Sequence, residues 1–182
     1  MPRLYLVRHG RPEATFSQAP DAGLDKAGLA QAETVAERLA PLGPLAIVAS
    51  PLKRARETAA PLERRWALSA RIEPAVGEIP SPMADPGARG VWLRALMQGR
   101  WGGADPALHA WRRAVLGGLT SLPESTVVVS HFVAINVALG EATGDDRVMV
   151  FSPDHCSVTI LDLVDGTLRL VERGREAATP VL

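Results

Sequence analysis

The sequence has little of several features that would indicate a particular class of protein. Its one cysteine, Cys156, excludes an internal disulfide and a site built from several thiolates. Its 20 basic and 20 acidic side chains cancel, so no overall charge would attract nucleic acid or an anionic membrane. No apolar stretch approaches the roughly 18 residues of a membrane span. The first apolar run ends at Arg8, too early for a secretory signal, and we therefore expect a cytoplasmic protein.

The length and composition are those of an ordinary globular protein. With 182 residues, 47% of them hydrophobic, the chain is long enough for one domain with a substantial core and too short for two. We therefore expect a single domain over residues 1–182. Residues 74–106 are rich in proline and glycine, which indicates an insertion between regular elements.

Short apolar runs bounded by turn residues predict strands, and helical spacings between them predict helices. The expected strands are residues 4–7, 45–49, 126–130, 157–163 and 168–172, the last two joined by a hairpin at Asp165 and Gly166. The expected helices are residues 26–42, 52–66, 106–122 and 132–142. Asp25 is expected to cap the first helix and Gly43 to end it, with an apolar face of Leu29, Ala32, Ala36 and Leu39. This alternation predicts an α/β fold of three layers, α/β/α, with a mostly parallel central sheet.

Polar residues follow three of the expected strands. His9 comes after the first strand, Ser50 after the second, and His131 after the strand at residues 126–130. In parallel α/β sheets, ligands bind at the edge formed by the carboxyl ends of the strands. The sequence therefore predicts that these three segments contribute to one site.

The tripeptide Arg8-His9-Gly10 combines groups that phosphate chemistry requires. It offers a nucleophilic imidazole, a permanent cation beside it, and a glycine that lets backbone approach a ligand closely. An attacking imidazole must present an unprotonated nitrogen, which a backbone carbonyl bound to the other nitrogen would secure. Alone, the tripeptide is a weak signal, and a surface or hydrogen-bonded histidine is the better explanation of it.

The segment from Ser50 to Ala59 adds a second phosphate-binding feature. Pro51 suits the first position of a helix, whose free N–H groups would then face the sheet edge and favour a phosphate there. Arg54, about one turn into the helix, offers a planar fork of donors that matches phosphate oxygens. The other basic residues of this helix are interpreted as a solvated face: Lys53, Arg56, Arg64 and Arg65.

A metal site is the alternative reading of the two histidines. His9 and His131 at two strand ends could bind a metal ion, but no third ligand at a characteristic spacing joins them. Phosphate binding also explains the arginines, which a metal site does not.

At these residues the sequence resembles the histidine phosphatase superfamily, also called phosphoglycerate mutase-like. The resemblance covers residues 6–10, Asp21, Leu24, Gly28, Gln31, Ala32, 50–59, Ser130, His131 and 156–161, which spans most of the chain. It implies a covalent mechanism without metal or cofactor, in which His9 attacks phosphorus and water cleaves the phosphohistidine. It also implies that Arg8, Arg54 and His131 surround the phosphoryl oxygens.

The resemblance further implies an acidic residue that protonates the leaving alcohol. Glu78, between Gly77 and Pro80, is the candidate, and a dianionic phosphate beside it would raise its pKa. An exposed loop carboxylate is the alternative interpretation of Glu78. Glu13 and Asp85 are weaker rivals for the role.

The sequence departs from the family pattern at several positions. Phosphoglycerate mutases carry an asparagine soon after the Arg-His-Gly motif, and this shorter chain lacks it, so phosphatase fits better than mutase. Phe132 replaces the glycine that usually follows the second histidine, and would wall the pocket or shift the backbone. His155 stands where an asparagine is common, with a structural role as the alternative. The candidate substrate contacts therefore include Phe132 and His155, together with Gly10 and Glu13.

The family places a variable cap over the active site at residues 74–106. Basic and aromatic groups there could hold the part of a substrate that does not react: Arg89, Trp92, Arg94, Arg100 and Trp101. Alternatively the segment forms two amphipathic helical turns that pack on the body through apolar residues: Val91, Leu93, Leu96 and Met97.

The sequence thus predicts a metal-independent phosphomonoesterase that acts on a small phosphorylated metabolite or a phosphoprotein. Two alternatives stay open: a phosphotransferase of the mutase type, and a module that binds or relays phosphorylated ligands without catalysis. No cofactor and no nucleic-acid or membrane partner is expected. The oligomeric state is not predicted.

Overall fold

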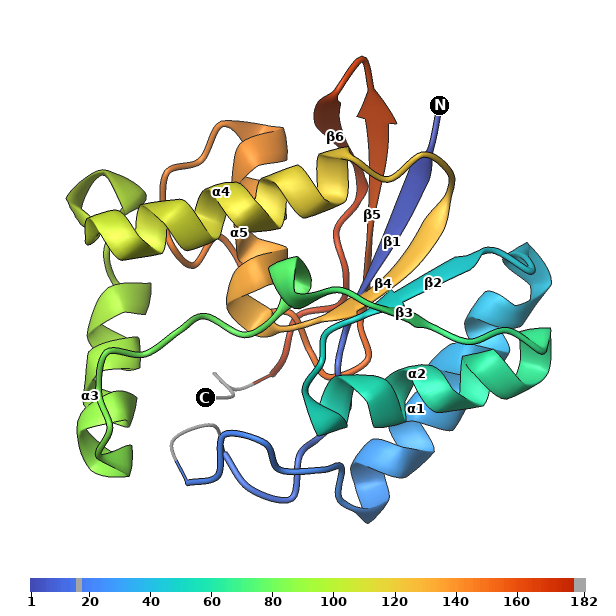
Figure 1. Ribbon diagram of the computed structural model, residues 1–182, viewed down its shortest axis with the longest axis horizontal. Coiled ribbons are helices and arrows are strands. Elements are labelled where there is room, and N and C mark those ends of the chain that lie inside the picture. The colour runs from blue at the N-terminus through green and yellow to red at the C-terminus, as the bar shows by residue number, and fades with distance from the viewer. Residues whose placement is uncertain (16–17, 179–182) are drawn as a thin grey trace.

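The computed structural model describes residues 1–15 and 18–178, and a six-stranded sheet forms the centre of this part of the chain (Figure 1). The strands lie in the order β3-β2-β4-β1-β5-β6. Their bounds are β1 Arg3–Arg8, β2 Ala46–Ala49, β3 Arg71–Ile72, β4 Thr126–Ser130, β5 Val158–Val164 and β6 Thr167–Glu172. The five expected strands are therefore confirmed, each within one residue of its expected ends.

The helices follow the strands in alternation. They are α1 Lys26–Leu39, α2 Lys53–Trp66, α3 Pro86–Met97, α4 Pro106–Thr120 and α5 Phe132–Thr143. Short 3₁₀ helices at Ala40–Leu42, Pro74–Val76 and Trp101–Gly103 complete the regular structure of the described residues. The four expected helices correspond to α1, α2, α4 and α5.

Two layers of helices cover the sheet, α1 and α2 on one face and α4 and α5 on the other (Figure 1). Strand β1 shows how the sequence produces this arrangement, because successive side chains of a strand point to opposite faces. Leu4 and Leu6 lie in the core with α4 and α5, whereas Val7 lies in the core with α1 and α2. The predicted three-layer α/β/α fold is confirmed. Helix α3 stands apart from both layers, at the left of Figure 1.

The sheet is mostly parallel, as predicted. Strands β3, β2, β4 and β1 run parallel, while β5 is antiparallel to β1 and β6 is antiparallel to β5. Asp165 and Gly166 join β5 to β6 with φ values of 49° and 77°, which suit a tight hairpin turn and confirm the predicted hairpin. Because β5 runs against β1, its first residues lie at the edge where β1 and β4 end: Val158 pairs with Val7.

Helix α1 begins as predicted and buries the predicted face at Ala32, Ala36 and Leu39, but not at Leu29. The side chain of Asp25 accepts a hydrogen bond from the backbone N–H of Gly28 at 2.7 Å, which confirms the N-cap. The 3₁₀ turn that follows the helix ends before Gly43, as expected. Leu29, expected in the core, is 50% exposed. Gly28 occupies the inward position instead, because the backbone of Arg11 lies against it with no room for a side chain.

The structure contains two elements that the sequence pattern did not predict. Strand β3 has only two residues, both exposed, and is too short and too polar to show a hydrophobic period. Helix α3 has 12 residues, so the segment at 74–106 holds a full helix and not only two turns. Asp85 caps α3 by accepting from the N–H of Ala88 at 2.8 Å, and this structural role accounts for the acid that the sequence offered as a rival to Glu78.

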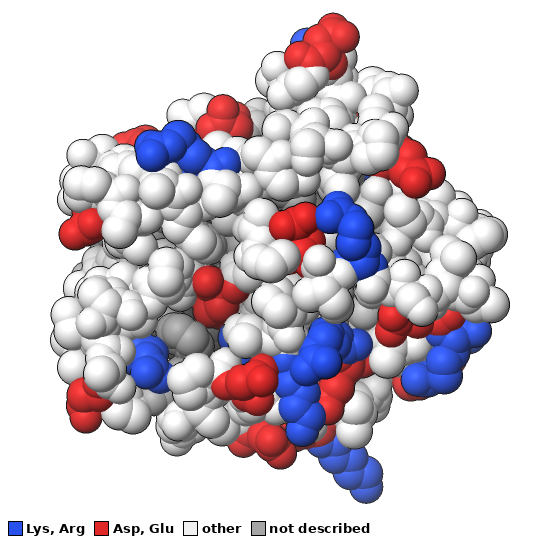
Figure 2. Space-filling view, in the orientation of Figure 1, with Lys and Arg blue, Asp and Glu red and all other residues white. Residues whose placement is uncertain are grey.

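The surface is consistent with the balanced charge of the sequence. On the face that Figure 2 shows, basic and acidic side chains are interspersed and no large area carries one sign. Among the described residues, no helix has both the length and the apolar character that crossing a membrane requires.

Candidate active site

The carboxyl ends of the parallel strands bring the predicted residues together. The rings of His9 and His131 lie 5.2 Å apart between centroids, and the hydroxyl of Ser50 lies 2.7 Å from Nε2 of His131. Arg54 comes from the first turn of α2, and Glu78 from the segment that follows β3. We call Arg8, His9, Arg54, Glu78 and His131 the strand-end cluster.

The backbone fixes the orientation of the His9 ring. Nδ1 of His9 lies 2.8 Å from the carbonyl oxygen of Gly10, to which it can only donate. Nε2 is therefore the unprotonated nitrogen, and it accepts from Nε of Arg54 at 3.2 Å. Burial lowers the pKa of His9 well below its usual range, and the neighbouring His131, Arg8 and Arg54 lower it further. His9 thus presents a neutral ring with an unprotonated Nε2, as the sequence argument required.

Arg54 connects the members of the cluster. Its Nη2 donates to Oε2 of Glu78 at 3.2 Å and lies 3.4 Å from Nδ1 of His131. Its Nη1 donates to the carbonyl oxygen of Pro20 at 2.8 Å. Only 3% of Arg54 is exposed, so this cation is held in one geometry by four partners.

Helix α2 contributes the side chain of Arg54 to the site, but it does not contribute the N–H groups at its N-terminus. The helix begins at Lys53, two residues after Pro51, so the expectation that Pro51 is the first helical residue is wrong. The backbone N–H of Lys53 donates to the carboxylate of Asp21 at 2.7 Å. A protein carboxylate thus occupies the position that the sequence analysis assigned to a phosphate.

Arg8 lies beside His9 under the ring of Phe132. The guanidinium carbon is 5.1 Å from the centroid of that ring, and Nη1 donates to the carbonyl oxygen of Pro153 at 2.8 Å. Burial lowers the pKa of Arg8 to about 10, which leaves it charged at neutral pH. Phe132 is 8% exposed and lines the cavity described below, which supports the expectation that its ring walls the pocket.

Glu78 is a half-buried carboxylate between two basic groups. Its Oε2 lies 3.4 Å from Nδ1 of His131, and its Oε1 accepts from the backbone N–H of Ile79 at 3.0 Å. Burial alone would raise the pKa of Glu78, but the charge and hydrogen bond of His131, together with Arg54, lower it to about 2. The reading of Glu78 as an exposed loop carboxylate is therefore wrong, since 13% of its side chain is exposed.

The structure supplies the third potential metal ligand that the sequence spacing did not reveal. Ligand atoms of His9, Glu78 and His131 all lie within 4.8 Å of one another. The guanidinium of Arg54 contacts all three of these side chains. A permanent cation in that position opposes a second cation and favours an anion, such as the phosphoryl group of a substrate.

A cavity of about 270 Å³ opens beside the cluster. Its lining residues are Arg8, His9, Arg11, Pro12, Thr15, Arg54, Glu78, Leu93, Met97, Phe132, Val133 and His155. His131 is fully buried and does not line this cavity; it contacts Arg54 and Glu78 from behind. His131 therefore acts on the cavity only through its contacts with Arg54 and Glu78.

Two candidate substrate contacts lie away from the cavity. Gly10 donates its N–H to Thr58 at 2.9 Å, and a Cβ at Gly10 would lie 2.7 Å from the carbonyl oxygen of Gly28. The glycine thus permits close approach to α1, and not to a ligand as expected. Glu13 is exposed and does not line the cavity; its Oε1 lies 3.4 Å from the N–H of Gly23.

His155 lines the cavity from the turn that precedes β5. Its ring centroid lies 6.0 Å from that of His9, and only 4% of the residue is exposed. Its Nε2 is buried without a hydrogen-bond partner in the described part of the protein. Burial and the nearby Arg8 lower the pKa of His155 to about 4, so the ring is neutral at pH 7.

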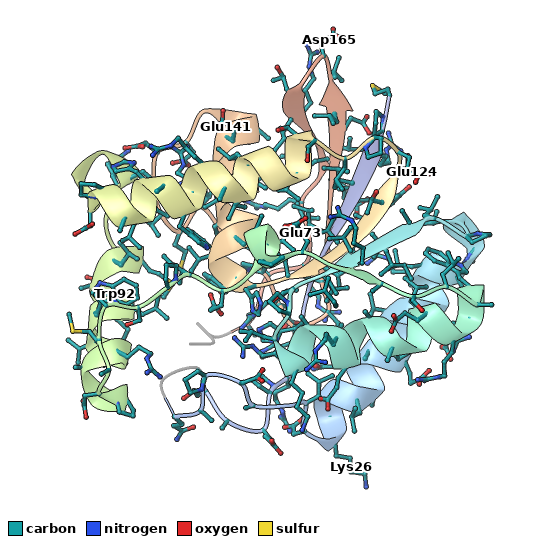
Figure 3. The ribbon with its side chains drawn as sticks, in the orientation of Figure 1. Lys26, Glu73, Trp92, Glu124, Glu141 and Asp165 are labelled. Carbon is teal, nitrogen blue, oxygen red and sulfur yellow. The ribbon has the colours of Figure 1, made fainter. Side chains whose placement is uncertain are left out.

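The structure confirms the packing alternative for most of the apolar residues considered in the 74–106 segment, since Leu93, Leu96 and Met97 pack in or against the core. Trp101, expected as a substrate contact, is 1% exposed in the core, and Trp92, labelled in Figure 3, packs against the same core. Leu93 and Met97, expected to pack on the body, also line the cavity. Their spacing of four residues marked one helical face, but the sequence did not show what that face meets. The three arginines lie outside the cavity lining: Arg89, Arg94 and Arg100.

Comparisons with known proteins show which sequences and folds this chain resembles. Residues 4–81 match the model of the histidine phosphatase superfamily (branch 1). The chain is 28% identical over 165 residues to "Probable phosphoglycerate mutase GpmB" of Erwinia tasmaniensis, a match that covers 79% of this chain and 76% of that protein. It is 38% identical over 76 residues to the uncharacterized protein Rv0525 of Mycobacterium tuberculosis. That match covers 40% of this chain and only 38% of the length of the relative.

A solved structure shows the same fold over nearly the whole chain. It is a phosphoserine phosphatase from Entamoeba histolytica in complex with 3-phosphoglyceric acid, with a TM-score of 0.77 and 20% sequence identity. The superposition covers 98% of each chain. At this identity the likeness shows the fold, a phosphoglycerate mutase-like α/β sheet, and leaves the substrate to be argued from the site.

Proposed function

We propose that this chain is a member of the histidine phosphatase superfamily and a phosphomonoesterase that works through a phosphohistidine on His9 without a metal ion. The observation that carries the proposal is the orientation of His9. Its Nδ1 donates to the carbonyl oxygen of Gly10, so Nε2 is unprotonated and accepts from Arg54, a hydrogen bond that must break before Nε2 attacks phosphorus. A buried, neutral and oriented imidazole is what nucleophilic attack on phosphorus requires.

The proposed reaction has two steps. In the first, Nε2 of His9 forms a bond to phosphorus while the bond to the ester oxygen breaks, and Glu78 gives its proton to the leaving alcohol. In the second, the carboxylate of Glu78 takes a proton from water, the water oxygen bonds to phosphorus, and the phosphorus–nitrogen bond breaks. Inorganic phosphate leaves, and His9 and Glu78 return to their starting forms.

The cationic groups of the cluster stabilise the transferring group. Arg54 contacts the attacking nitrogen directly, so its guanidinium lies where the phosphoryl oxygens would arrive. Arg8 lines the same cavity and adds a second cation. We assign His131 a supporting role, since it holds Arg54 and Glu78 from the buried side. Phe132 and His155 complete the contacts proposed for the substrate, because both line the cavity.

The protonation of Glu78 depends on the substrate in this proposal. The protein groups alone lower the pKa of Glu78 to about 2, because His131 and Arg54 offset the effect of burial. A phosphate dianion that binds to Arg54 would weaken this effect and add a negative charge beside the carboxylate. Both changes raise the pKa of Glu78 and favour its protonated form only when substrate is bound.

A mutase-type phosphotransferase is the second candidate, because the chain resembles a protein named as a phosphoglycerate mutase over most of its length. The two activities differ in the acceptor of the phosphoryl group. In a phosphatase the acceptor is water, whereas in a mutase it is a second hydroxyl of a phosphorylated metabolite. We favour water because the mutase asparagine is missing after Gly10.

The test measures hydrolysis of p-nitrophenyl phosphate in the presence of a chelator. The wild-type protein is expected to remain active and to yield acid-labile, base-stable phosphate on the protein. His9→Ala is expected to lose both properties. His109→Ala is the matched control, since His109 lies on α4 outside the cavity lining, and it is expected to retain both.

Three results would overturn the proposal. Full activity of His9→Ala would exclude His9 as the nucleophile. Complete loss of wild-type activity with the chelator would replace the mechanism with a metal-assisted one that uses His9, Glu78 and His131. Phosphate transfer to a second hydroxyl of phosphoglycerate, faster than release of inorganic phosphate, would favour the mutase.

A further inference from the structure

The cavity beside His9 has a charged part and an apolar part. Arg8, Arg54 and Glu78 surround His9 and form the charged part. The apolar part, which we call the apolar wall, consists of Pro12, Leu93, Met97, Phe132 and Val133. The wall combines the loop after β1 with α3 and the first turn of α5, so segments from three parts of the chain present aliphatic or aromatic surface to one space.

The remaining cations of the cavity are poorly placed to bind a second acidic group of a substrate. Among the described lining residues, Arg11 is the only cation outside the cluster, and its Nε already pairs with the carboxylate of Asp25 at 2.5 Å. The ring of His155 is held neutral by burial, which lowers its pKa to about 4. A substrate carboxylate in this cavity would therefore lose hydration and compete with Asp25 for the guanidinium of Arg11.

We infer that the substrate of this site is a phosphomonoester of a small apolar alcohol or phenol, an alkyl or aryl phosphate. This inference rests on the proposed function and names the substrate class of the same site. An alkyl or aryl group would bury its surface against Leu93 and Met97, whereas hydroxyl or carboxylate groups would lose hydrogen bonds to water there. A volume of about 270 Å³ is at the small end for ligand sites, which limits the size of the group.

The main experiment compares kcat/KM for n-hexyl phosphate, phosphoserine and glycerol 3-phosphate. All three are esters of primary alcohols, so differences in leaving-group chemistry are small and the comparison reports the organic part. We expect n-hexyl phosphate to exceed each of the others by about tenfold or more, the size of effect that apolar contacts give in a binding pocket.

Two substitutions on the same helix localise the preference to the wall. Leu93→Lys places a cation in the cavity and is expected to lower the ratio of kcat/KM for n-hexyl phosphate over phosphoserine by about tenfold. Val91→Lys is the matched control, because Val91 is 61% exposed and lies outside the cavity lining. It is expected to leave the ratio unchanged.

A binding measurement separates this inference from the proposed reaction. n-Hexylphosphonate cannot be hydrolysed, and calorimetry is expected to show tighter binding than for 2-carboxyethylphosphonate, with a negative heat-capacity change from apolar burial. Preferred hydrolysis of phosphoserine, with phosphate trapped on His9, would overturn the apolar substrate class and leave the phosphatase intact. Selective phosphonate binding without any hydrolysis would overturn the phosphatase and keep the apolar ligand. Failure of both hydrolysis and binding would overturn both.

Discussion

The strand-end cluster and helix α3 line one cavity, but they are held in different ways. In the cluster, His9, Arg54 and His131 are each at most 4% exposed, and each contacts at least two other groups of the protein. In α3, Met97 is the one buried residue, and no member of that helix contacts the cluster through a described hydrogen bond. The chemistry is thus fixed by a network, while the wall depends on apolar packing.

This difference teaches which properties of the protein can vary independently. A buried network of hydrogen bonds and charges tolerates little change, because a lost partner leaves a polar group unsatisfied. An apolar surface that faces a cavity tolerates changes in size and polarity at a smaller cost. We therefore expect changes in the cluster to alter rate and changes in α3 to alter substrate preference.

The largest effect is expected where the network is densest. Arg54→Lys keeps the charge but removes the planar fork that contacts His9, Glu78 and His131, so we expect kcat/KM to fall by about 10²–10³-fold. Arg56→Lys is the matched control on the exposed face of the same helix and is expected to remain at the wild-type value. Steady-state kinetics with p-nitrophenyl phosphate measures both. Equal kcat/KM for Arg54→Lys and Arg56→Lys would contradict the expectation that the cluster is more sensitive to substitution than the exposed face of α2.

The next effect tests the acid of the cluster. Glu78→Gln retains the hydrogen bond from Ile79 but cannot give a proton, so hydrolysis of an alkyl phosphate is expected to fall by about 10²-fold. Hydrolysis of p-nitrophenyl phosphate is expected to fall by less than about tenfold, because nitrophenolate leaves without a proton. Glu124→Gln, on an exposed residue labelled in Figure 3, is the control and should change neither rate. Equal losses for both esters in Glu78→Gln would exclude the acid role.

The smallest effect concerns the support of the cluster by α1. A Cβ at Gly28 would lie 2.1 Å from the carbonyl oxygen of Arg11, so Gly28→Ala must displace the loop that follows His9. We expect the free energy of unfolding to fall by about 2 kcal/mol. Gly117→Ala on α4 meets no atom within 4 Å and should raise it by about 0.5–1 kcal/mol, through helix propensity. Urea denaturation compares the two. An increase in the free energy of unfolding for Gly28→Ala would contradict this prediction and show that the loop after His9 moves aside at no cost.

The sequence predicted the parts of the site that depend on strand direction. His9, Ser50 and His131 each follow a buried strand with clear hydrophobic patterning, and parallel pairing brings such positions to one edge. Arg54 could be placed because it lies one turn into a helix that starts at the same edge. These positions follow from local periodicity and from general rules of α/β topology.

Other features depend on contacts between distant segments and could not be predicted. The hydrogen bond from the backbone N–H of Lys53, at the start of α2, to Asp21 joins residues 32 positions apart in the chain. The hydrogen bond from Arg54 to Glu78 joins residues 24 positions apart. Leu93 and Met97 looked like packing residues because apolar side chains on a helix usually are. Only the position of α3 beside the cavity distinguishes a face that packs from a face that receives a ligand.

Because β5 runs antiparallel to β1, the segment that enters β5 also contributes to the candidate active site. The parallel strands deliver residues where they end, but β5 delivers His155 just before it begins. His155 lies in a turn outside the paired residues of β5, so one residue added or deleted in this turn would change what points toward the cavity and leave the register of β5 unchanged. A change in the length of this turn during evolution would therefore alter the residues that line the cavity, while the parallel strands kept their register.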